Sequence, residues 1–332
     1  MSKKKSEEVS KIVGNYFTED KPKEFIHSGC TLLDCVLGGG YPLGRVVNIV
    51  GDKSSNKTGL AIEAFANFNI QFPEGTMYYH EAEAAFDIDY AKTLGMPVDK
   101  VSFVEGNTIE ELFNSLDSVC KFHRENNTPG LYVIDSLDAL SDKAEKERDI
   151  GEGSFGAAKA KKLSELFRRL ISDIEKTMVC LIVISQVRDN IGITFGSKHT
   201  RSGGRALDFY ASQIVWLAEI KKITKTVKGV ERPTGAWIRA KCKKNKISLP
   251  FRECDFPILF GFGVDSILAN LVWLKDIKGG LEGLEIDPKT INSLSTKIIE
   301  EQDFSYMNKL ESYTKDLWYE TEKDFLPKSR KY

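Results

Sequence analysis

The sequence contains no long apolar run. The longest ones, such as Leu181–Ile184, are far shorter than the roughly 20 residues that a membrane-spanning helix needs. The lysine-rich start, Met1–Lys5, is followed by Ser6–Glu8 at the place where a signal peptide would carry its apolar stretch. No export signal is visible, and we expect a cytoplasmic protein without a membrane partner.

Cysteine and histidine are both sparse. None of the six cysteines forms a C-x-x-C pair, and none of the four histidines stands at a spacing typical of zinc ligands. Several cysteines lie inside apolar segments, as Cys180 does, which is typical of buried free thiols in a reducing compartment. We therefore expect unpaired, buried cysteines, and we assign no metal site to the cysteines or histidines.

The chain has almost no net charge. Its 47 basic and 48 acidic residues leave a formal charge of −1, which argues against coating of nucleic acid or anionic membrane by bulk charge. That total is an average over segments of opposite sign. Residues 221–246 hold ten basic residues and one acidic residue, a net charge of +9, whereas residues 281–325 hold five lysines and eleven acidic residues, a net charge of −6. Binding of an anionic partner by part of the surface therefore stays open.

Apolar segments that are typical of buried strands alternate with helix-patterned segments of ten or more residues. Such alternation predicts β-α-β units and an α/β fold with a mostly parallel, twisted sheet. Three later strands follow without long helices between them and predict an antiparallel extension. The expected parallel strands are 45–50, 77–79, 101–104, 131–134 and 179–185, the expected helices are 59–71, 109–122 and 157–175, and the later strands are 214–217, 237–242 and 255–260.

A phosphate-binding motif follows the first of these strands. Residues Gly51–Thr58 match G-x-x-x-x-G-K-T, except that Asn56 stands where the second glycine belongs. In this motif backbone N–H groups cradle the phosphates, Lys57 reaches the β- and γ-phosphates, and Thr58 offers its hydroxyl to Mg²⁺. Asparagine tolerates a positive φ, so Asn56 can keep the loop shape, although a serine-rich turn before an ordinary helix is the alternative. The expected nucleotide-binding residues of the loop are Gly51, Asp52, Lys53, Ser54, Ser55, Asn56, Lys57, Thr58 and Gly59.

Three further polar groups stand after predicted strands. Asp135 suits a nucleotide- and Mg²⁺-binding carboxylate, because ligands gather at the carboxyl ends of strands in open α/β sheets; a helix N-cap is the alternative. Glu83 could polarise a water for attack on the γ-phosphate, and by sequence alone Glu81 is its rival. Gln186 could sense the γ-phosphate, where a surface glutamine is the alternative.

These four elements, in this order, resemble the RecA family of recombinases over about residues 26–264. Residues 51–58 resemble the family's Walker A motif, residues 135–140 resemble its Walker B motif, and residues 80–95 resemble the stretch with the catalytic glutamate and the adenine contacts. By that match the catalytic carboxylate is Glu83, and the residues against the adenine are Asp87 and Tyr90.

Two segments, at about residues 145–157 and 187–204, resemble the family's DNA-binding loops. Arginine side chains there can pair with DNA phosphates, and apolar side chains can wedge between bases. The DNA-binding residues that the resemblance and this chemistry indicate are Phe155, Arg188, Ile191, Arg201, Gly203, Gly204 and Arg205.

The segment Lys243–Lys246 resembles the family's K-N-K motif, whose lysines reach across the subunit interface to the ATP of the adjacent protomer. On that pattern Lys244 and Lys246 contribute to catalysis in trans, like arginine fingers. Phe209 occupies the family position that relays between DNA and a neighbouring ATP.

The resemblance implies an N-terminal oligomerisation segment (1–28), a RecA-like ATPase core (29–264) and a small α-rich C-terminal domain (265–332). It also implies a DNA-dependent ATPase that uses ATP and Mg²⁺. Such a protein forms helical filaments on single-stranded DNA and promotes pairing and strand exchange with homologous double-stranded DNA in recombination and repair.

The chain departs from the family pattern at several positions. Asn56 replaces a glycine, Gly59 stands where hydroxyl-bearing residues are common, and Arg205 stands where bacterial members usually carry asparagine. This divergence resembles that of phage-encoded RecA-like proteins, which act in the host cytoplasm. Three alternatives stay open: a nucleotide-dependent DNA-binding mediator with weak or lost hydrolysis, a hexameric ring helicase on the same core, and a P-loop small-molecule kinase.

Overall fold

A ten-stranded sheet forms the centre of the computed structural model, which describes residues 24–147, 156–189, 199–201 and 204–329. Along the sheet the strands follow the order β12-β11-β10-β9-β3-β7-β6-β4-β5, and β8 pairs with β7. The strands are β3 (Val46–Gly51), β4 (Thr76–Glu81), β5 (Val101–Val104), β6 (Pro129–Asp135), β7 (Met178–Asp189), β8 (His199–Arg201), β9 (Gln213–Val227), β10 (Val230–Asn245), β11 (Glu253–Leu259) and β12 (Gly263–Val264).

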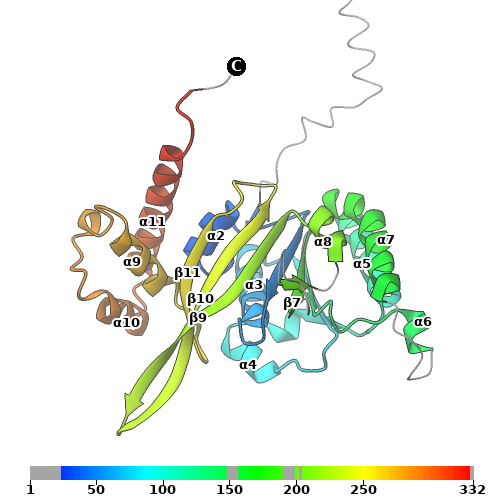
Figure 1. Ribbon diagram of the computed structural model, residues 1–332, viewed down its shortest axis with the longest axis horizontal. Coiled ribbons are helices and arrows are strands. Elements are labelled where there is room, and N and C mark those ends of the chain that lie inside the picture. Colours follow the sequence, from blue (N-terminus) through cyan, green and yellow to red (C-terminus); the bar gives the residue numbers. More distant parts are fainter. Residues whose placement is uncertain (1–23, 148–155, 190–198, 202–203, 330–332) are drawn as a thin grey trace, which may run out of the picture.

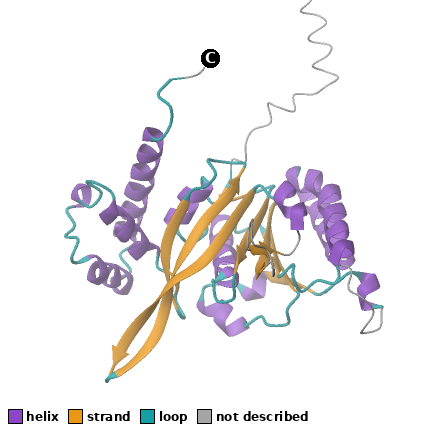
Figure 2. Cartoon of the chain, in the orientation of Figure 1, coloured by secondary structure: helices purple, strands orange, loops and turns teal. Residues whose placement is uncertain are grey.

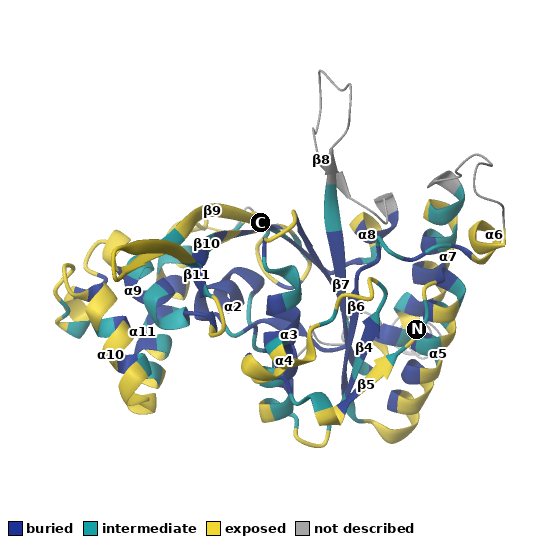
Figure 3. Ribbon diagram, turned by 90° about the horizontal axis from the view of Figure 1, so that it is seen from below, coloured by how far each residue is buried: buried dark blue, intermediate teal, exposed yellow. Residues whose placement is uncertain are grey.

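The half of the sheet from β9 to β5 is parallel throughout, and the other half is antiparallel. The sequence predicted both parts, except that β9, which was expected in the antiparallel extension, also pairs parallel with β3. Helices cover both faces of the parallel half, so its central strands β3 and β6 are buried, as Figure 3 shows. Alternate residues of β3 separate the two cores: Val47 and Ile49 pack with α3 on one face, and Val46 and Val50 pack with α5 and α7 on the other. The covering helices are α3 (Lys57–Gln71), α5 (Ile109–Asn126), α7 (Gly156–Glu175) and α8 (Gly204–Tyr210), and α2 (Thr31–Leu37) packs against β10 and β11 of the other half.

Short elements complete this part of the chain. A two-stranded sheet pairs β1 with β2, and single turns of helix follow several strands. All six cysteines are buried and unpaired, as predicted. In the described ranges no helix is long and apolar enough to cross a membrane. The short elements are β1 (Phe25–Ile26), β2 (Tyr41–Pro42), α4 (Ile88–Thr93), α6 (Lys143–Lys146) and the 3-10 helices Val98–Lys100 and Glu282–Leu284.

Strands β9 and β10 are much longer than the sequence indicated. They form a ribbon whose far half extends beyond the rest of the molecule, ending at the pair Val227–Val230 (Figures 1 and 2). Only the inner ends, near the predicted segments 214–217 and 237–242, have a buried face. The outer half is exposed on both faces and rich in lysine, so it carries no alternation of apolar and polar residues from which a strand could be predicted.

The C-terminal part is helical, as predicted, and packs beside β11 and α2. It has an apolar core of its own, which includes Leu271, Leu274 and Leu310. An ion pair between Arg252 and Glu322, with 2.5 Å between Nη2 and Oε2, joins it to the turn between β10 and β11. The three helices are α9 (Ser266–Asp276), α10 (Ile291–Glu301) and α11 (Phe304–Asp324). The exact domain division stays a prediction.

Candidate active site

The four motif segments meet at one edge of the sheet. In the strand register Gly51 of β3 lies opposite Gln186 of β7, and Glu81 of β4 lies opposite Asp135 of β6. All four strands are parallel, so their carboxyl ends reach the same edge, where open α/β sheets bind their ligands. The fold therefore brings together motifs that are far apart in the sequence; Gly51 and Gln186 are separated by 135 positions.

The phosphate loop folds tightly between β3 and α3. Ser54 and Asn56 both have φ of 63°, in the left-handed region, as expected for Asn56. The Ser55 hydroxyl and the Lys57 Nζ both donate to the Asp52 carbonyl, at 2.8 and 2.7 Å. A side chain at Gly51 would meet Ser55 Oγ at 2.3 Å, so this turn requires glycine. The loop thus has the shape, the lysine and the helix N-terminus that a phosphate chain needs.

The two departures from the motif, Asn56 and Gly59, are in contact. The carboxamide of Asn56 folds over Gly59, and a Cβ built on Gly59 would lie 2.3 Å from Asn56 Oδ1 and 2.5 Å from Nδ2. Asn56 Nδ2 is buried and has no hydrogen-bond partner among the described residues. Any larger residue at 59 would therefore require the Asn56 carboxamide to move, because the carboxamide occupies the space that a side chain there would need.

Asp135 accepts hydrogen bonds from two hydroxyl groups on the same oxygen. Thr58 Oγ1 donates to Asp135 Oδ2 at 2.6 Å, and the Tyr79 hydroxyl donates to it at 2.9 Å. Burial raises the pKa of Asp135, while the two hydroxyl donors oppose that shift. Burial likewise lowers the pKa of Lys57, and the nearby carboxylates of Asp135 and Glu83 oppose it. The buried carboxylate of Asp135 and the ammonium group of Lys57 therefore lie close enough for each to stabilise the charge of the other.

Glu81 and Glu83 differ sharply in their surroundings. The Glu81 carboxylate accepts from backbone N–H groups of its own loop, those of Glu83 at 2.9 Å, Ala85 at 3.4 Å and Phe86 at 3.0 Å. Glu83 Oε1 instead accepts from the Ser136 hydroxyl and from Gln186 Nε2, the latter at 2.8 Å. Glu81 thus braces the loop, and Glu83 faces the neighbouring motifs.

Asp87 and Tyr90 lie at the start of α4, beyond this loop. Asp87 Oδ1 accepts from the Tyr90 backbone N–H at 2.9 Å and so caps the helix. Tyr90 is half-buried, and burial raises the pKa of its hydroxyl. Their expected contact with adenine stays a prediction.

Lys244 and Lys246 lie at the opposite edge of the sheet. The register pairs Lys244 with Ile214 and Gln213 with Val47, at the amino end of β3. The Lys244 Nζ donates to the carbonyls of Asp208 and Phe209, the latter at 3.0 Å, and the Lys246 Nζ donates to the Phe209 carbonyl at 3.4 Å. Both lysines therefore bind the C-terminal end of α8, where cations are favoured. The Phe209 side chain beside them is 69% exposed.

Several of the predicted DNA-binding residues, Phe155, Ile191 and Gly203, lie outside the described residues. Arg188 and Arg201 lie on β7 and β8, which pair antiparallel through Val187–Arg201 and Arg188–Thr200 and so form the base of the second predicted DNA loop. Gly204 and Arg205 begin α8. Their contacts with DNA stay predictions.

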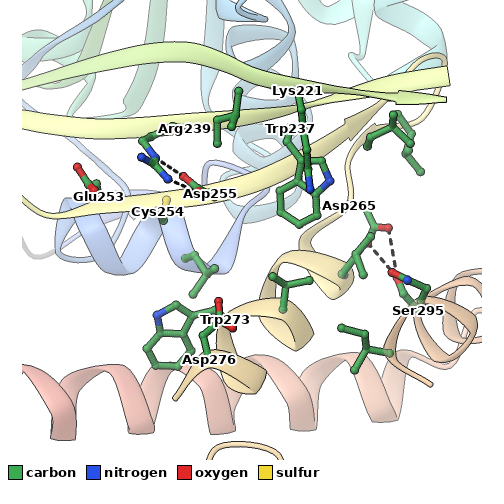
Figure 4. A pocket seen from close by; sticks show the side chains of 18 of the residues that line it. Lys221, Trp237, Arg239, Glu253, Cys254, Asp255, Asp265, Trp273, Asp276 and Ser295 are labelled. Atoms are coloured by element: carbon green, nitrogen blue, oxygen red, sulfur yellow. Dashed lines mark hydrogen bonds and ion pairs between the residues drawn. The ribbon is translucent and has the colours of Figure 1, made fainter. Parts of the chain in front are cut away.

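A large cavity lies elsewhere, between the outer strands β9–β11 and helices α9 and α10. Its volume is about 860 Å³, and Trp237 and Trp273 stand on opposite walls (Figure 4). Arg239 is paired there with Asp255, at 2.7 Å between Nε and Oδ1. None of its described lining residues belongs to the four motif segments. The candidate active site is thus separate from this cavity.

A phosphate loop between a buried strand and a helix, with Asp135 beside Thr58 and Glu83 beside Gln186, defines a P-loop nucleotide-binding protein of the α/β class. Two relatives named Protein RecA agree with that class. The protein from Leptospira biflexa serovar Patoc is 38% identical over 255 residues, which are 76% of this chain and 63% of that protein. The protein from Nostoc punctiforme is 36% identical over 244 residues, 74% of this chain and 65% of that protein.

The family model of the RecA N-terminal domain matches residues 9–265. The chain belongs to the RecA family. A third relative, Protein RecA of Streptomyces venezuelae, is 38% identical over 245 residues, 74% of this chain and 62% of that protein. The chain covers less than two thirds of the length of these relatives.

Proposed function

We propose that the chain is an ATP-dependent recombinase. It hydrolyses ATP in a DNA-dependent reaction, forms helical filaments on single-stranded DNA, and promotes pairing and strand exchange with homologous double-stranded DNA. Membership of the RecA family supports this proposal, together with one observation at the site. That observation is the hydrogen bond between Glu83 and Gln186, which connects the phosphate side of the site to β7 and hence to the second DNA loop.

ATP fits the residues of the loop. The left-handed turns at Ser54 and Asn56 expose backbone N–H groups, and the N-terminus of α3 adds its dipole, so phosphate oxygens have donors on several sides. Lys57 already reaches across the loop to a carbonyl and would exchange that contact for the β- and γ-phosphates. Asp87 and Tyr90 at the start of α4 are the candidates to hold the adenine.

Mg²⁺ fits the pair of Thr58 and Asp135. Both offer oxygen atoms, the ligands that Mg²⁺ prefers, and they already lie 2.6 Å apart. When bound, the ion would neutralise charge that develops on the phosphates. The described residues contain no cluster of three or more His, Cys, Asp or Glu that could hold a metal without the nucleotide. Thr58 and Asp135 would hold the ion together with the phosphates of the nucleotide.

Glu83 holds and orients the water that attacks the γ-phosphate. In the structure Ser136 and Gln186 donate hydrogen bonds to Glu83 Oε1, so the attacking water and Gln186 would compete for that oxygen. A shift of Gln186 moves β7, whose end carries Arg188 at the base of the second loop. The bond thus offers a physical link between nucleotide state and DNA contact, which is what coupling of two sites requires.

Lys244 and Lys246 complete the site of a neighbouring chain. They lie at the far edge of the sheet from their own phosphate loop, so they serve a loop in a second copy placed head to tail. Open repetition of that contact yields a filament. The DNA residues are those of the two loops, with Arg188, Arg201 and Arg205 on phosphates and Phe155 and Ile191 between bases. Gly203 and Gly204 are the remaining candidates for DNA contact.

ATP turnover with and without single-stranded DNA tests the proposal, together with negative-stain images of the protein with DNA and a slowly hydrolysed ATP analogue. We expect DNA-stimulated turnover and open filaments. Undetectable turnover under both conditions, with filaments present, would favour a nucleotide-dependent DNA-binding mediator, for which Asn56 in the phosphate loop is the supporting observation. Closed rings would favour a helicase instead.

A further inference from the structure

Tyr79 contacts Asp135, although the sequence motifs did not indicate it. It lies on β4, directly beside Val133 of β6 in the register, and two residues further along β6 is Asp135 on the same face. Its hydroxyl donates to Asp135 Oδ2 at 2.9 Å. Thr58 donates to the same oxygen. Two fixed donors on one oxygen leave the carboxylate little freedom to rotate.

The ring of Tyr79 is packed tightly on several sides, so the orientation of its hydroxyl is fixed. The side chain is 1% exposed. Its ring centroid lies 4.5 Å from that of Phe86, in the segment between Glu83 and Asp87, and 5.9 Å from that of Phe65 on α3. Tyr79 therefore touches the helix of the phosphate loop, the adenine-side segment and the carboxylate between them.

A hydrogen bond at this hydroxyl is not an automatic result of burial. Tyr41 is also completely buried, and its hydroxyl has no partner among the described residues. The core thus tolerates a tyrosine hydroxyl that binds nothing. The Tyr79 hydroxyl instead donates to Asp135, the buried carboxylate that also accepts a hydrogen bond from Thr58.

We propose that Tyr79 is a positioning residue for Mg²⁺: its hydroxyl holds the Asp135 carboxylate in the orientation that serves the metal ion of a bound nucleotide. The inference rests on the proposed ATP-binding function. Residues that orient a metal-side ligand through a hydrogen bond commonly change metal affinity by roughly 10- to 100-fold when they are removed. Tyr79 would act in that way without touching the ion.

Tyr79→Phe removes the hydroxyl and keeps the ring, so it tests this role with little disturbance of the core. The probe is a fluorescent ATP analogue, titrated first in EDTA and then with increasing Mg²⁺. We expect an unchanged affinity in EDTA and a rise of roughly tenfold in the Mg²⁺ concentration needed for half-maximal tightening. Mn²⁺, a transition-metal ion that binds such sites more tightly, should shift the midpoint back.

Tyr132→Phe is the matched control. Tyr132 lies on β6, next to β4, and is fully buried, and its hydroxyl donates to Ser115 Oγ at 3.0 Å and contacts His80 Nδ1 at 2.9 Å, on the opposite face of the sheet. It should lower the melting temperature and leave the Mg²⁺ midpoint at the wild-type value. Should Tyr79→Phe keep the wild-type midpoint, or Tyr132→Phe shift it equally, the positioning role is wrong. Wild-type protein that binds the analogue neither with nor without Mg²⁺ would instead overturn the proposed function.

Discussion

The two edges of the parallel sheet carry the two halves of the proposed chemistry, and only one half is complete within a single chain. At the carboxyl edge Asp135 and Glu83 already contact groups from neighbouring motifs, and Lys57 contacts the Asp52 carbonyl of its own loop. At the amino edge Lys244 and Lys246 bind the end of α8. Val47 and Gly51 mark these edges on β3, and the four residue steps between them span roughly 13 Å. The cis half is therefore preformed, whereas the trans half needs a second copy.

Removal of Lys57 should have the largest effect, because it breaks the preformed edge. We expect Lys57→Ala to abolish ATP binding, and with it hydrolysis and filament formation, since Lys57 is the lysine that the motif places on the β- and γ-phosphates. Equilibrium binding of a fluorescent ATP analogue measures this. Lys121→Ala, which removes an exposed lysine paired with Asp117 on α5, is the control and should bind normally. If Lys57→Ala keeps the wild-type affinity for ATP, the assignment of Gly51–Thr58 as the phosphate-binding loop is wrong.

Removal of Lys244 and Lys246 should disable the trans half of the site at the amino edge and leave the cis half at the carboxyl edge intact. The double variant Lys244→Ala with Lys246→Ala should bind ATP as the wild type does and lose roughly 10²- to 10³-fold of the DNA-stimulated turnover, as expected when charge-stabilising donors are removed. The measurements are ATP affinity and steady-state turnover with single-stranded DNA. Normal stimulation would refute the trans role.

A mixture of the two defective proteins sharpens this test. Neither the Lys57→Ala chain nor the double-lysine variant supports turnover alone. In mixed filaments, however, an intact phosphate loop of one chain meets intact lysines of the other, and activity should return. Such complementation is possible only if the two halves of the site come from different chains. No recovery, in mixtures that form filaments, would place both halves in the same chain.

The sequence predicted the parallel half of the sheet well, because each buried strand is a short apolar run bounded by turns and followed by a helical pattern. It predicted the outer ribbon of β9 and β10 poorly, because Lys221, Lys222 and Lys225 face water and leave no apolar alternation. In such an exposed ribbon the backbone pairing itself defines the strands.

The candidate active site likewise contains residues that the sequence predicts and residues that it does not. The phosphate loop and Asp135 follow from local patterns. The choice between Glu81 and Glu83 does not follow from the residues alone, since it depends on which carboxylate the loop backbone captures. Tyr79 could not be found at all, because a tyrosine in an apolar strand is typical of a core residue. Its partner depends on β4 lying beside β6, which the order of strands along the chain does not reveal.

Asn56 and Gly59 offer a smaller test of the preformed edge. Gly59→Thr should weaken ATP binding and lower stability, because the new side chain collides with the Asn56 carboxamide. Adding Asn56→Gly clears the space, so the double variant should recover. The coupling between the two positions should be about 1–3 kcal/mol, in the range for residues in direct contact. Melting temperature and ATP affinity of the wild type, both single variants and the double variant complete the cycle, and additive effects would mean that the contact has no energetic role.

Substitution of Arg188 should have the smallest effect. It tests whether the residues at the carboxyl edge of the sheet also contact DNA. It stands two residues beyond Gln186 on β7. If it pairs with one phosphate, Arg188→Ala should weaken binding of single-stranded DNA and reduce the slope of log affinity against log salt by roughly 0.7, the value for one released counterion. Arg124→Ala, which removes an ion pair between Arg124 on α5 and Asp173 on α7, is the control and should keep the wild-type slope. An unchanged slope in Arg188→Ala would exclude Arg188 from the phosphate contacts. The preformed edge would then end at Gln186, and the coupling between Glu83 and DNA would have to pass through the loop beyond it.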